Sequence, residues 1–313
     1  MNLMTQRIDP VKLLSDEQRR ATPPVPKRVL IELTARCDFR CFFCASHTRP
    51  REKSDMPWWL YTRIVKELRQ LGVEQLGVFF LGESFLCDWL PEAIRYAKRD
   101  CGYPHVFLTT NGRLATAERV RECMLAGLDS LKFGFNFSGP GQFHDVTRMK
   151  ADEYHTVVNN IKDARWMRDY VEVSTGHRCG LCASSLLYDD KQRDRMEEVI
   201  GDILPYVDEH DWVPLYGYAG LPHSARHASA ACEGGKQAPR KPLPCAGPFV
   251  EGHITCDGRL SACSLDHNPR YQMGNLRHMS FAEAWRSEPF QRLREAHLAK
   301  NVSGTACEKC IAY

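Results

Sequence analysis

The sequence predicts an α/β protein: a partial (β/α)6 barrel followed by a small cysteine-rich domain. Strand-like and helix-like segments alternate about six times between Arg28 and Tyr218, which favours a parallel sheet with its helices outside. A closed eight-unit barrel needs about 250 residues, whereas the alternating region has about 190. After Tyr218 the alternation stops, and this last part of the chain holds six of the fourteen cysteines. We therefore expect an open barrel at 28–218 and a second domain at 219–313.

Each element is predicted from a short local pattern. The expected strands are runs rich in β-branched and aromatic residues, at 28–34, 75–81, 105–109, 131–137, 170–175 and 212–215. The expected helices carry apolar residues at helical spacing, at 61–71, 88–99, 116–126, 152–167 and 191–207. Gly127 is expected to end the third helix. In the second domain we expect a hairpin at 249–261 that turns at Asp257-Gly258 and a helix at 281–293.

The N-terminal segment and the overall composition exclude several classes of protein. Pro23, Pro24 and Pro26 forbid a regular helix, so residues 1–27 are expected to form an arm and a stiff linker. No apolar run approaches the roughly 18 residues of a membrane helix, and the first residues lack a signal-peptide pattern. The formal net charge of +3 is too balanced for a nucleic-acid footprint. We expect a cytoplasmic protein with no membrane or nucleic-acid partner.

A first cysteine cluster directly follows the first expected strand. Cys37, Cys41 and Cys44 have the spacing C-x3-C-x2-C. Three thiolates on one loop can ligate three irons of a [4Fe–4S] cluster and leave the fourth iron open to another ligand. The alternative is a fragment of a zinc site, although structural zinc normally takes four protein ligands.

This loop resembles the signature of the radical S-adenosylmethionine (SAM) superfamily, C-x3-C-x-aromatic-C, with Phe43 as the aromatic residue. The resemblance implies that the open iron binds SAM and that reductive cleavage of SAM gives a 5′-deoxyadenosyl radical. Gly82-Glu83-Ser84 resembles the family's Gly-Gly-Glu-Pro segment, but Leu81 and Ser84 depart from it. The SAM-binding residues that the resemblance implies are Phe43, Gly82, Glu83, Ser84, Asn111, Asn136 and Arg148.

A second cluster combines Cys245 and Cys263, around the expected hairpin, with the C-x2-C pair Cys307 and Cys310. Four thiolates can close a metal site, and spacing alone does not separate zinc from iron–sulfur. The pattern resembles the twitch domain, a shortened SPASM domain that follows the radical SAM barrel. Because the chain ends three residues after Cys310, this resemblance implies one auxiliary [4Fe–4S] cluster in addition to the SAM-binding cluster.

Other cysteines lie outside these two clusters. Cys256 falls between two expected ligands, where it is either a packing residue or the donor of a hydrogen atom to a substrate radical. Cys179 and Cys182 form a third C-x2-C pair, which is expected by chance in a cysteine-rich chain. The polar residues near expected strand ends or in the second domain that could contact a substrate are His177, Arg178, Tyr216, Tyr218, His223 and Arg226.

The family resemblance gives hydrogen abstraction but leaves the product open, because the cofactor carries the chemistry and the protein chooses the substrate. Relatives with one auxiliary cluster suggest a sugar, aminocyclitol or aminoglycoside of antibiotic biosynthesis, with epimerisation ahead of dehydrogenation at a hydroxyl-bearing carbon. The alternatives are decarboxylation of a sugar-nucleoside acid, ribosomal-peptide maturation, and a zinc-binding scaffold without catalysis. Only 27 residues precede the first expected strand, which counts against a peptide-recognition domain there. An external flavodoxin- or ferredoxin-type reductant is the implied partner.

Overall fold

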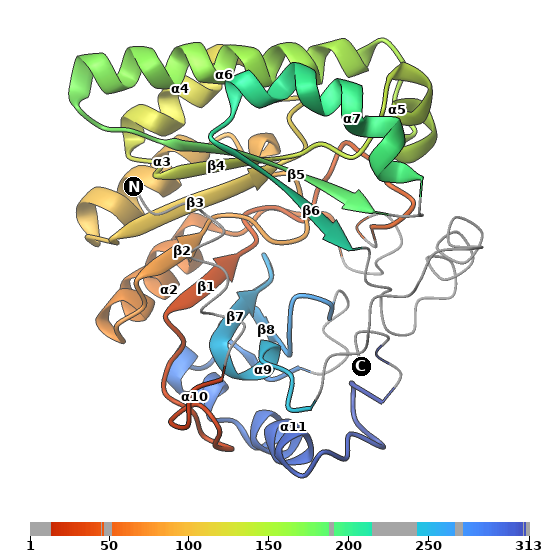
Figure 1. The fold of residues 1–313 in the computed structure, drawn as a ribbon. Coiled ribbons are helices and arrows are strands. Elements are labelled where there is room, and N and C mark those ends of the chain that lie inside the picture. Colours follow the sequence, from red (N-terminus) through yellow and green to blue (C-terminus); the bar gives the residue numbers. More distant parts are fainter. Residues whose placement is uncertain are drawn as a thin grey trace.

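The fold is known from a computed structural model of the chain, in which the described residues are 14–44, 46, 52–187, 191–214, 243–266, 272–308 and 310 (Figure 1). The strands form one nine-stranded sheet in the order β6-β5-β4-β3-β2-β1-β7-β8-β9. Neighbouring strands run parallel from β6 to β7, and β8 and β9 are antiparallel. The strands are β1 (Arg28–Ile31), β2 (Gln75–Gly77), β3 (His105–Thr110), β4 (Ser130–Gly134), β5 (Gly180–Leu187), β6 (Glu209–Pro214), β7 (Glu251–Ile254), β8 (Arg259–Ser261) and β9 (Gly274–Asn275).

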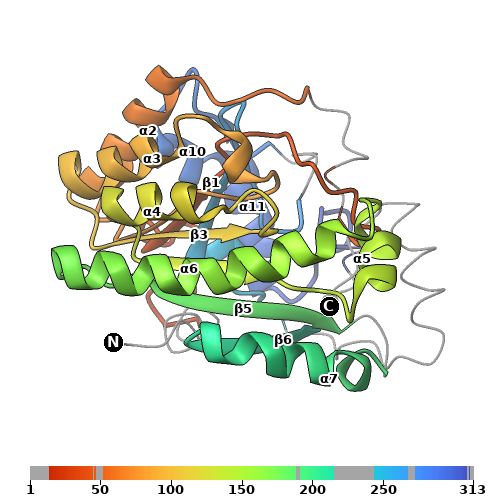
Figure 2. The same ribbon diagram turned by 90° about the horizontal axis from the view of Figure 1, so that it is seen from above.

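Strands β1 to β6 form the predicted open barrel, with helices on its outer face (Figures 1 and 2). Within the described residues β6 and β9 are the two edges of the sheet, and they do not pair with each other. The barrel helices are α2 (Trp58–Gln70), α3 (Leu90–Arg95), α4 (Ala117–Ala126), α5 (Pro140–Thr147), α6 (Glu153–Thr175) and α7 (Gln192–Ile203). Short helical turns lie at η3 (Ser84–Leu86), η4 (Tyr96–Asp100) and η5 (Leu204–Tyr206).

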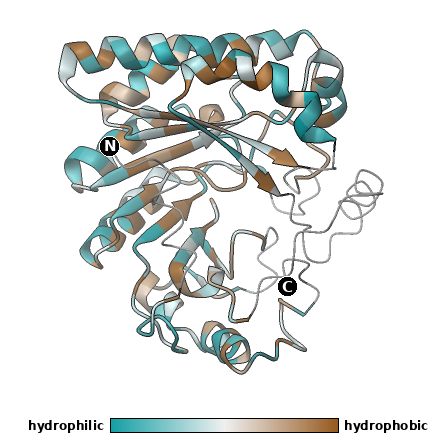
Figure 3. Cartoon of the chain, viewed as in Figure 1, coloured by the Kyte–Doolittle hydropathy of each residue, from teal (hydrophilic) through white to brown (hydrophobic). Residues whose placement is uncertain are grey.

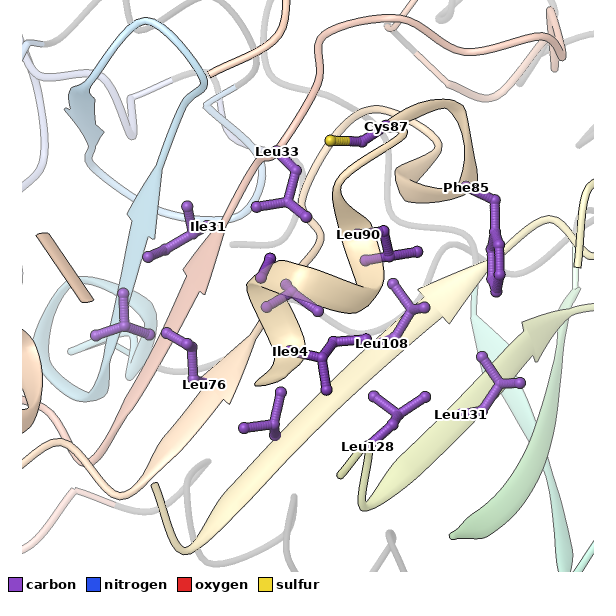
Figure 4. Packing of buried hydrophobic residues seen from close by; sticks show 14 of the residues in the cluster. Ile31, Leu33, Leu76, Phe85, Cys87, Leu90, Ile94, Leu108, Leu128 and Leu131 are labelled. Atoms are coloured by element: carbon purple, nitrogen blue, oxygen red, sulfur yellow. The ribbon is translucent and has the colours of Figure 1, made fainter. Parts of the chain in front are cut away.

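Alternation along the strands separates a hydrophobic outer face from a lumenal face. Ile31, Leu76 and Leu108 are fully buried and pack with Leu90 and Ile94 of α3 (Figure 4). The outer helices carry both hydrophilic and hydrophobic residues, as expected for helices that bury one face and expose the other (Figure 3). The intervening strand residues point the other way. The lumen is therefore lined by a second set of side chains that does not belong to this core.

The C-terminal domain continues the barrel sheet. β7 pairs with β1 in parallel, with Ile31 opposite Ile254, and the antiparallel strands β8 and β9 follow. The predicted hairpin is confirmed, and Gly258 takes a positive φ of 86° in its turn. The domain also contains α9 (Gly247–Val250), α10 (Phe281–Trp285) and α11 (Glu288–Leu298). The expected domain boundary near residue 218 lies outside the described residues.

The strand expected at 170–175 is wrong, because these residues form the last turns of α6. Alternation would place Val171 and Val173 on the same face of a strand, yet Val171 is 1% exposed and Val173 is 89% exposed. Val171 instead continues the buried stripe of α6 that includes Ile161 and Ala164. Gly176, at φ 74°, ends the helix, and the fifth strand follows at β5.

The helix expected at 281–293 is broken into α10 and α11. Pro289 lies in the first turn of α11, where its missing N–H costs nothing, whereas in a continuous helix it would remove a hydrogen bond. Ser280 begins α10 with a capping box that Glu283 completes. Helix α5 was not predicted.

No helix in the described part of the chain is long and apolar enough to cross a membrane.

The N-terminal segment packs against the C-terminal domain through Trp285. This indole is fully buried, stacks on Phe281 with ring centroids 5.8 Å apart, and lies 4.2 Å from the guanidinium carbon of Arg294. Its Nε1 donates to the carbonyl oxygen of Pro24 at 3.0 Å. Residues 23 and 24, which were expected to form a linker, are therefore anchored to α10.

Replacing Trp285 by Ala should destabilise the protein by about 3–5 kcal/mol, because a large buried side chain leaves a cavity. The matched control is Trp166→Ala on α6, where the indole is 67% exposed and the expected change is within about 0.5 kcal/mol. Urea unfolding monitored by circular dichroism measures both variants. Equal midpoints for the two variants would contradict the anchoring role of Trp285.

Candidate active site

The cysteine loop follows β1 at the carboxyl edge of the sheet and is fixed by backbone hydrogen bonds to α5. Arg40 N–H donates to the carbonyl of Thr147 at 2.8 Å, and Phe42 N–H donates to that of Val146 at 3.3 Å. Phe43 is buried and packs on Val146. The C-terminal end of α5 thus fixes the loop that carries Cys37, Cys41 and Cys44.

Asp38 ties the same loop to the end of β3. Its Oδ1 accepts a hydrogen bond from Asn111 Nδ2 at 2.7 Å, and its Oδ2 accepts one from Arg113 Nε at 2.6 Å. Asn111, which the family resemblance assigned to SAM binding, therefore also positions the cysteine loop. Asp38 was missed from sequence because a lone carboxylate between two cysteines gives no signal until β3 is known to end beside it.

The thiols of the loop lie in an environment that opposes their ionisation. Burial raises the pKa of Cys41 well above its usual value, and the nearby Cys44 and Cys37 raise it further. Burial also raises the pKa of Cys37, with Glu83, Cys44 and Asp38 adding to the effect. Thiolates packed together in this way require a cation, and iron is a suitable one because thiolate is its ligand in iron–sulfur clusters. The donor set fits the three-cysteine side of a [4Fe–4S] cluster.

Glu83 is a buried carboxylate held by three donors. Its Oε2 accepts from Asn111 N–H at 2.7 Å, and its Oε1 accepts from Thr110 Oγ1 at 2.9 Å and from Phe85 N–H at 3.1 Å. Burial nevertheless raises its pKa to about 7. A carboxylate that is costly to desolvate gains most from a nearby cation, so Glu83 fits the ammonium group that the family resemblance assigns to it.

The two neighbours of Glu83 position it. A Cβ on Gly82 would lie 1.9 Å from the carbonyl oxygen of Thr34 and 2.7 Å from that of Arg36, so only glycine fits this approach to the segment that follows β1. Ser84 Oγ donates to the carbonyl of Val78 at 2.8 Å, so its hydroxyl has a local structural bond.

Asn136 and Arg148 occupy different environments. Asn136 Oδ1 accepts a hydrogen bond from Leu186 N–H at 2.9 Å, which joins the ends of β4 and β5. Arg148 is the C-cap of α5, has a left-handed backbone conformation and is exposed. It directly follows Thr147, whose carbonyl accepts the hydrogen bond from the cysteine loop. Contact of either side chain with SAM stays a prediction.

The second cluster brings Cys245, Cys263, Cys307 and Cys310 into one region. Burial raises the pKa of Cys263 well above its usual value, with Cys307 and Cys245 adding to the effect. Burial raises that of Cys307 to about 12, with contributions from Cys310 and Cys245. The charges that act on these two thiols are again thiols and a carboxylate, Asp266.

Backbone donors point at two of these sulfurs. Gly247 N–H donates to Cys245 Sγ at 3.3 Å and Leu265 N–H donates to Cys263 Sγ at 3.4 Å. Among the described residues no three His, Cys, Asp or Glu side chains converge closely enough to hold a single metal ion. Four cysteine thiolates are the usual donor set of a [4Fe–4S] cluster, in which the thiolates ligate different irons, so these four cysteines fit an auxiliary cluster.

The hydrogen-donor candidate Cys256 lies in the turn after β7. Its side chain is 1% exposed and belongs to the hydrophobic core, and its N–H donates to Glu32 Oε2 at 2.9 Å. Cys179 is also a core residue, whereas Cys182 lies on the lumenal face of β5 and donates to Glu209 Oε1 at 3.2 Å. These different surroundings are consistent with the expectation that the C-x2-C spacing of Cys179 and Cys182 arises by chance.

Two polar candidates lie at the wrong edge of the sheet. His177 and Arg178 precede β5 rather than follow a strand, because the fifth strand begins at Gly180. Arg178 pairs with Glu172 and Asp208, and His177 Nε2 lies 2.8 Å from the carbonyl of Leu128. The other candidates lie outside the described residues: Tyr216, Tyr218, His223 and Arg226.

Comparison with known families agrees with this geometry. Residues 31–169 match the radical SAM superfamily, and residues 245–311 match the iron–sulfur cluster-binding domain named SPASM. The chain is a radical SAM protein with a C-terminal SPASM domain. The first match contains the cysteine loop and the Glu83 site, and the second contains all four cysteines of the second cluster.

Two relatives of known activity are similar in sequence. The PqqA peptide cyclase of Streptomyces rochei is 32% identical over 116 residues, which are 37% of this radical SAM protein and 31% of that enzyme. The GTP 3′,8-cyclase of Chlorobaculum tepidum is 29% identical over 279 residues, covering 76% of this chain and 78% of that enzyme. The chain thus spans about a third of the first relative and most of the second.

Solved structures share the fold. BtrN in complex with AdoMet and 2-DOIA matches with a TM-score of 0.57 at 14% identity, over 91% of each chain. SuiB of Streptococcus suis bound to S-adenosylmethionine matches with a TM-score of 0.67 at 14% identity, over 93% of this chain and 76% of that one. At this identity the similarity shows the fold alone.

The radical SAM domain binds SAM and a [4Fe–4S] cluster, and the SPASM domain binds auxiliary iron–sulfur clusters. When bound, these groups supply radical hydrogen-atom abstraction and one-electron transfer. Cys37, Cys41 and Cys44 would hold the first cluster, and Glu83 would orient the SAM ammonium. Thr110, Asn111 and Phe85 keep the Glu83 carboxylate in place.

Replacing Cys41 by Ala should remove the first cluster, because two remaining thiolates cannot hold three irons. Iron per chain should fall from about eight to about four, and 5′-deoxyadenosine should no longer form from SAM. The control is Cys123→Ala, which changes a fully buried core cysteine of α4. Iron and sulfide analysis after anaerobic reconstitution gives the result, and full iron content in Cys41→Ala would refute the assignment.

A second prediction concerns the Glu83 turn. Gly82→Ala should weaken SAM binding at least about tenfold, which is about 1.4 kcal/mol, because the new methyl meets backbone that cannot give way. Gly141→Ala in α5 meets nothing within 4 Å and should bind SAM normally. Equilibrium dialysis with labelled SAM compares the two, and equal affinity would show that the turn tolerates a side chain.

Proposed function

We propose that this radical SAM protein abstracts hydrogen from a hydroxyl-bearing carbon of a small carbohydrate-like metabolite, giving epimerisation or oxidation. The substrate class is a sugar, aminocyclitol or aminoglycoside, and antibiotic biosynthesis is the proposed context. The observation that carries the proposal is the polar lining of the barrel lumen. A lumen of charged and hydrogen-bonding side chains suits a small molecule with many hydroxyl or amino groups.

One part of this lining is a row across three neighbouring strands. Lys132 of β4 lies opposite Cys182 of β5, which lies opposite Glu209 of β6. Asp211 follows on the same face of β6. Burial lowers the pKa of the Lys132 ammonium, while Cys182, Asp211 and Glu209 oppose this effect. The row thus offers an amine, a thiol and two carboxylates to a ligand.

A second part lies on β7 and β1. His253 Nε2 is 2.8 Å from Glu251 Oε2, and Glu251 also lies 3.7 Å from the guanidinium of Arg28. His253 is 1% exposed, and its Nδ1 has no hydrogen-bond partner. Since an unsatisfied buried nitrogen costs about 1–3 kcal/mol, a ligand hydroxyl at this position would restore the lost hydrogen bond.

The relatives support more than one substrate class. The structure of BtrN contains 2-DOIA, which favours a small-molecule substrate. The name of the GTP 3′,8-cyclase indicates a nucleotide substrate. SuiB was also solved bound to its precursor peptide SuiA, and the PqqA relative is a peptide cyclase. Peptide maturation is therefore the second candidate function. The row of charged residues across the lumen favours the metabolite.

The fate of the substrate radical depends on the chain's thiols. Epimerisation needs a thiol that returns a hydrogen atom; the resulting sulfur radical then takes up one electron from the external reductant and one proton from solvent. Cys256 is the proposed donor from the sequence, and Cys182 is a second candidate on the lumenal face. Oxidation needs no thiol: the substrate radical would lose a proton to solvent and pass one electron to the auxiliary cluster. We propose a flavodoxin- or ferredoxin-type reductant and a cytoplasmic location.

The test is turnover of the reconstituted protein in deuterium oxide with aminocyclitols, aminoglycosides, sugar-nucleoside acids and, separately, synthetic peptides. We expect 5′-deoxyadenosine formation to rise with a carbohydrate-like compound. One deuterium in an isomeric product indicates epimerisation, and loss of two hydrogens indicates oxidation. In the first case Cys182→Ala and Cys256→Ala identify the donor, with Cys123→Ala as the control. Stimulation by peptides alone would refute the proposal.

A further inference from the structure

A buried histidine links two of the four cysteines of the auxiliary site. His297 lies in the last turn of α11 and is fully buried. Its Nε2 is 3.2 Å from Cys307 Sγ, and its Nδ1 is 3.3 Å from the backbone N of Cys245. The ring therefore contacts Cys245, at the entrance to α9, and Cys307, in the terminal C-x2-C pair.

The backbone contact determines the tautomer. The Cys245 N–H can only donate, so Nδ1 must accept and carry no proton. In a neutral imidazole the proton then lies on Nε2, and Nε2–H donates to Cys307 Sγ. Phe249 packs against the ring at 90°, with centroids 6.2 Å apart, and this contact restricts ring rotation. The hydrogen-bond direction is thus fixed by the fold.

His297 differs from the other donors at this site. The hydrogen bonds to Cys245 Sγ and Cys263 Sγ come from backbone N–H groups of Gly247 and Leu265, which no substitution of a side chain removes. The bond to Cys307 Sγ comes from a side chain. A substitution at His297 therefore removes a hydrogen bond to Cys307 Sγ and leaves these two backbone donors in place.

We propose that His297 is a positioning residue that raises the reduction potential of the auxiliary cluster through its hydrogen bond to Cys307. Reduction adds negative charge to the cluster and its thiolates, and a donor aimed at a thiolate stabilises that charge. Hydrogen bonds to the sulfurs and burial are recognised determinants of iron–sulfur potentials, and such outer partners also orient the ligands. The proposal goes beyond the proposed function, because it holds whatever the substrate is.

The test uses the full chain with Cys37, Cys41 and Cys44 replaced by Ala, so that the auxiliary cluster is the one cluster measured. In this background His297→Leu removes the donor, and His297→Gln retains an N–H donor near the position of Nε2. His177→Leu, at the far edge of β5, is the control for loss of a histidine. Redox titration followed by electron paramagnetic resonance gives the midpoint potential, and iron and sulfide analysis gives the occupancy.

We expect His297→Leu to lower the equilibrium constant for one-electron reduction about tenfold, which is about 59 mV, at unchanged iron content. His297→Gln should restore most of the potential, and His177→Leu should not change it. If His297→Leu loses the cluster, His297→Gln decides the outcome: a retained cluster at the parent potential supports the proposal. An unchanged potential in His297→Leu, loss of the cluster in both variants, or zinc in place of iron in the parent would overturn it.

Discussion

Buried negative charge is the constraint on which the active site depends. Glu83 is buried and Cys37 and Cys41 are partly buried, and burial raises the pKa of each. No arrangement of these groups is stable as anions unless cations come to them. The hydrogen bonds around these groups hold them in place and do not neutralise them. The donors to Glu83 are a neutral hydroxyl and neutral amides, and the Arg113 guanidinium beside the cysteine loop is paired with Asp38. Iron at the thiols and the SAM ammonium at Glu83 would complete the balance of charge.

The auxiliary site repeats this design with different donors. Its cysteines come from the segment before α9, from the loop after β8 and from the C-x2-C pair near the C-terminus, and Cys307 of this pair contacts α11. In both sites the helices and turns hold the cysteine-bearing segments, α5 for the first loop and α11 for the second. The first cysteine loop follows β1 and the auxiliary cysteines lie before and after β7, and β7 pairs directly with β1.

The sequence predicts those parts of the molecule that depend on local spacing. The hairpin at Gly258 and the open barrel are confirmed by the fold, the C-x3-C-x2-C loop led to the family that the comparison shows, and the cysteine ligand groups stay predictions. Residues 170–175 were misassigned because β-branched residues also occur in a helix whose buried stripe continues. The lumenal row, Asp38 and His297 were missed, because each depends on strand register or on contacts between distant segments that no short motif records.

The pairing of β1 with β7 has a consequence for motion. Two domains joined only by a linker can rotate about a hinge, as many enzymes with closing domains do. Here four consecutive residues of β1 pair with β7, and Glu32 N–H extends this ladder to the carbonyl of Ile254 at 2.9 Å. Rotation of one domain against the other would break these hydrogen bonds together. The ladder therefore opposes a hinge motion, and it keeps the cysteine loop after β1 at a set spacing from the cysteines that follow β7.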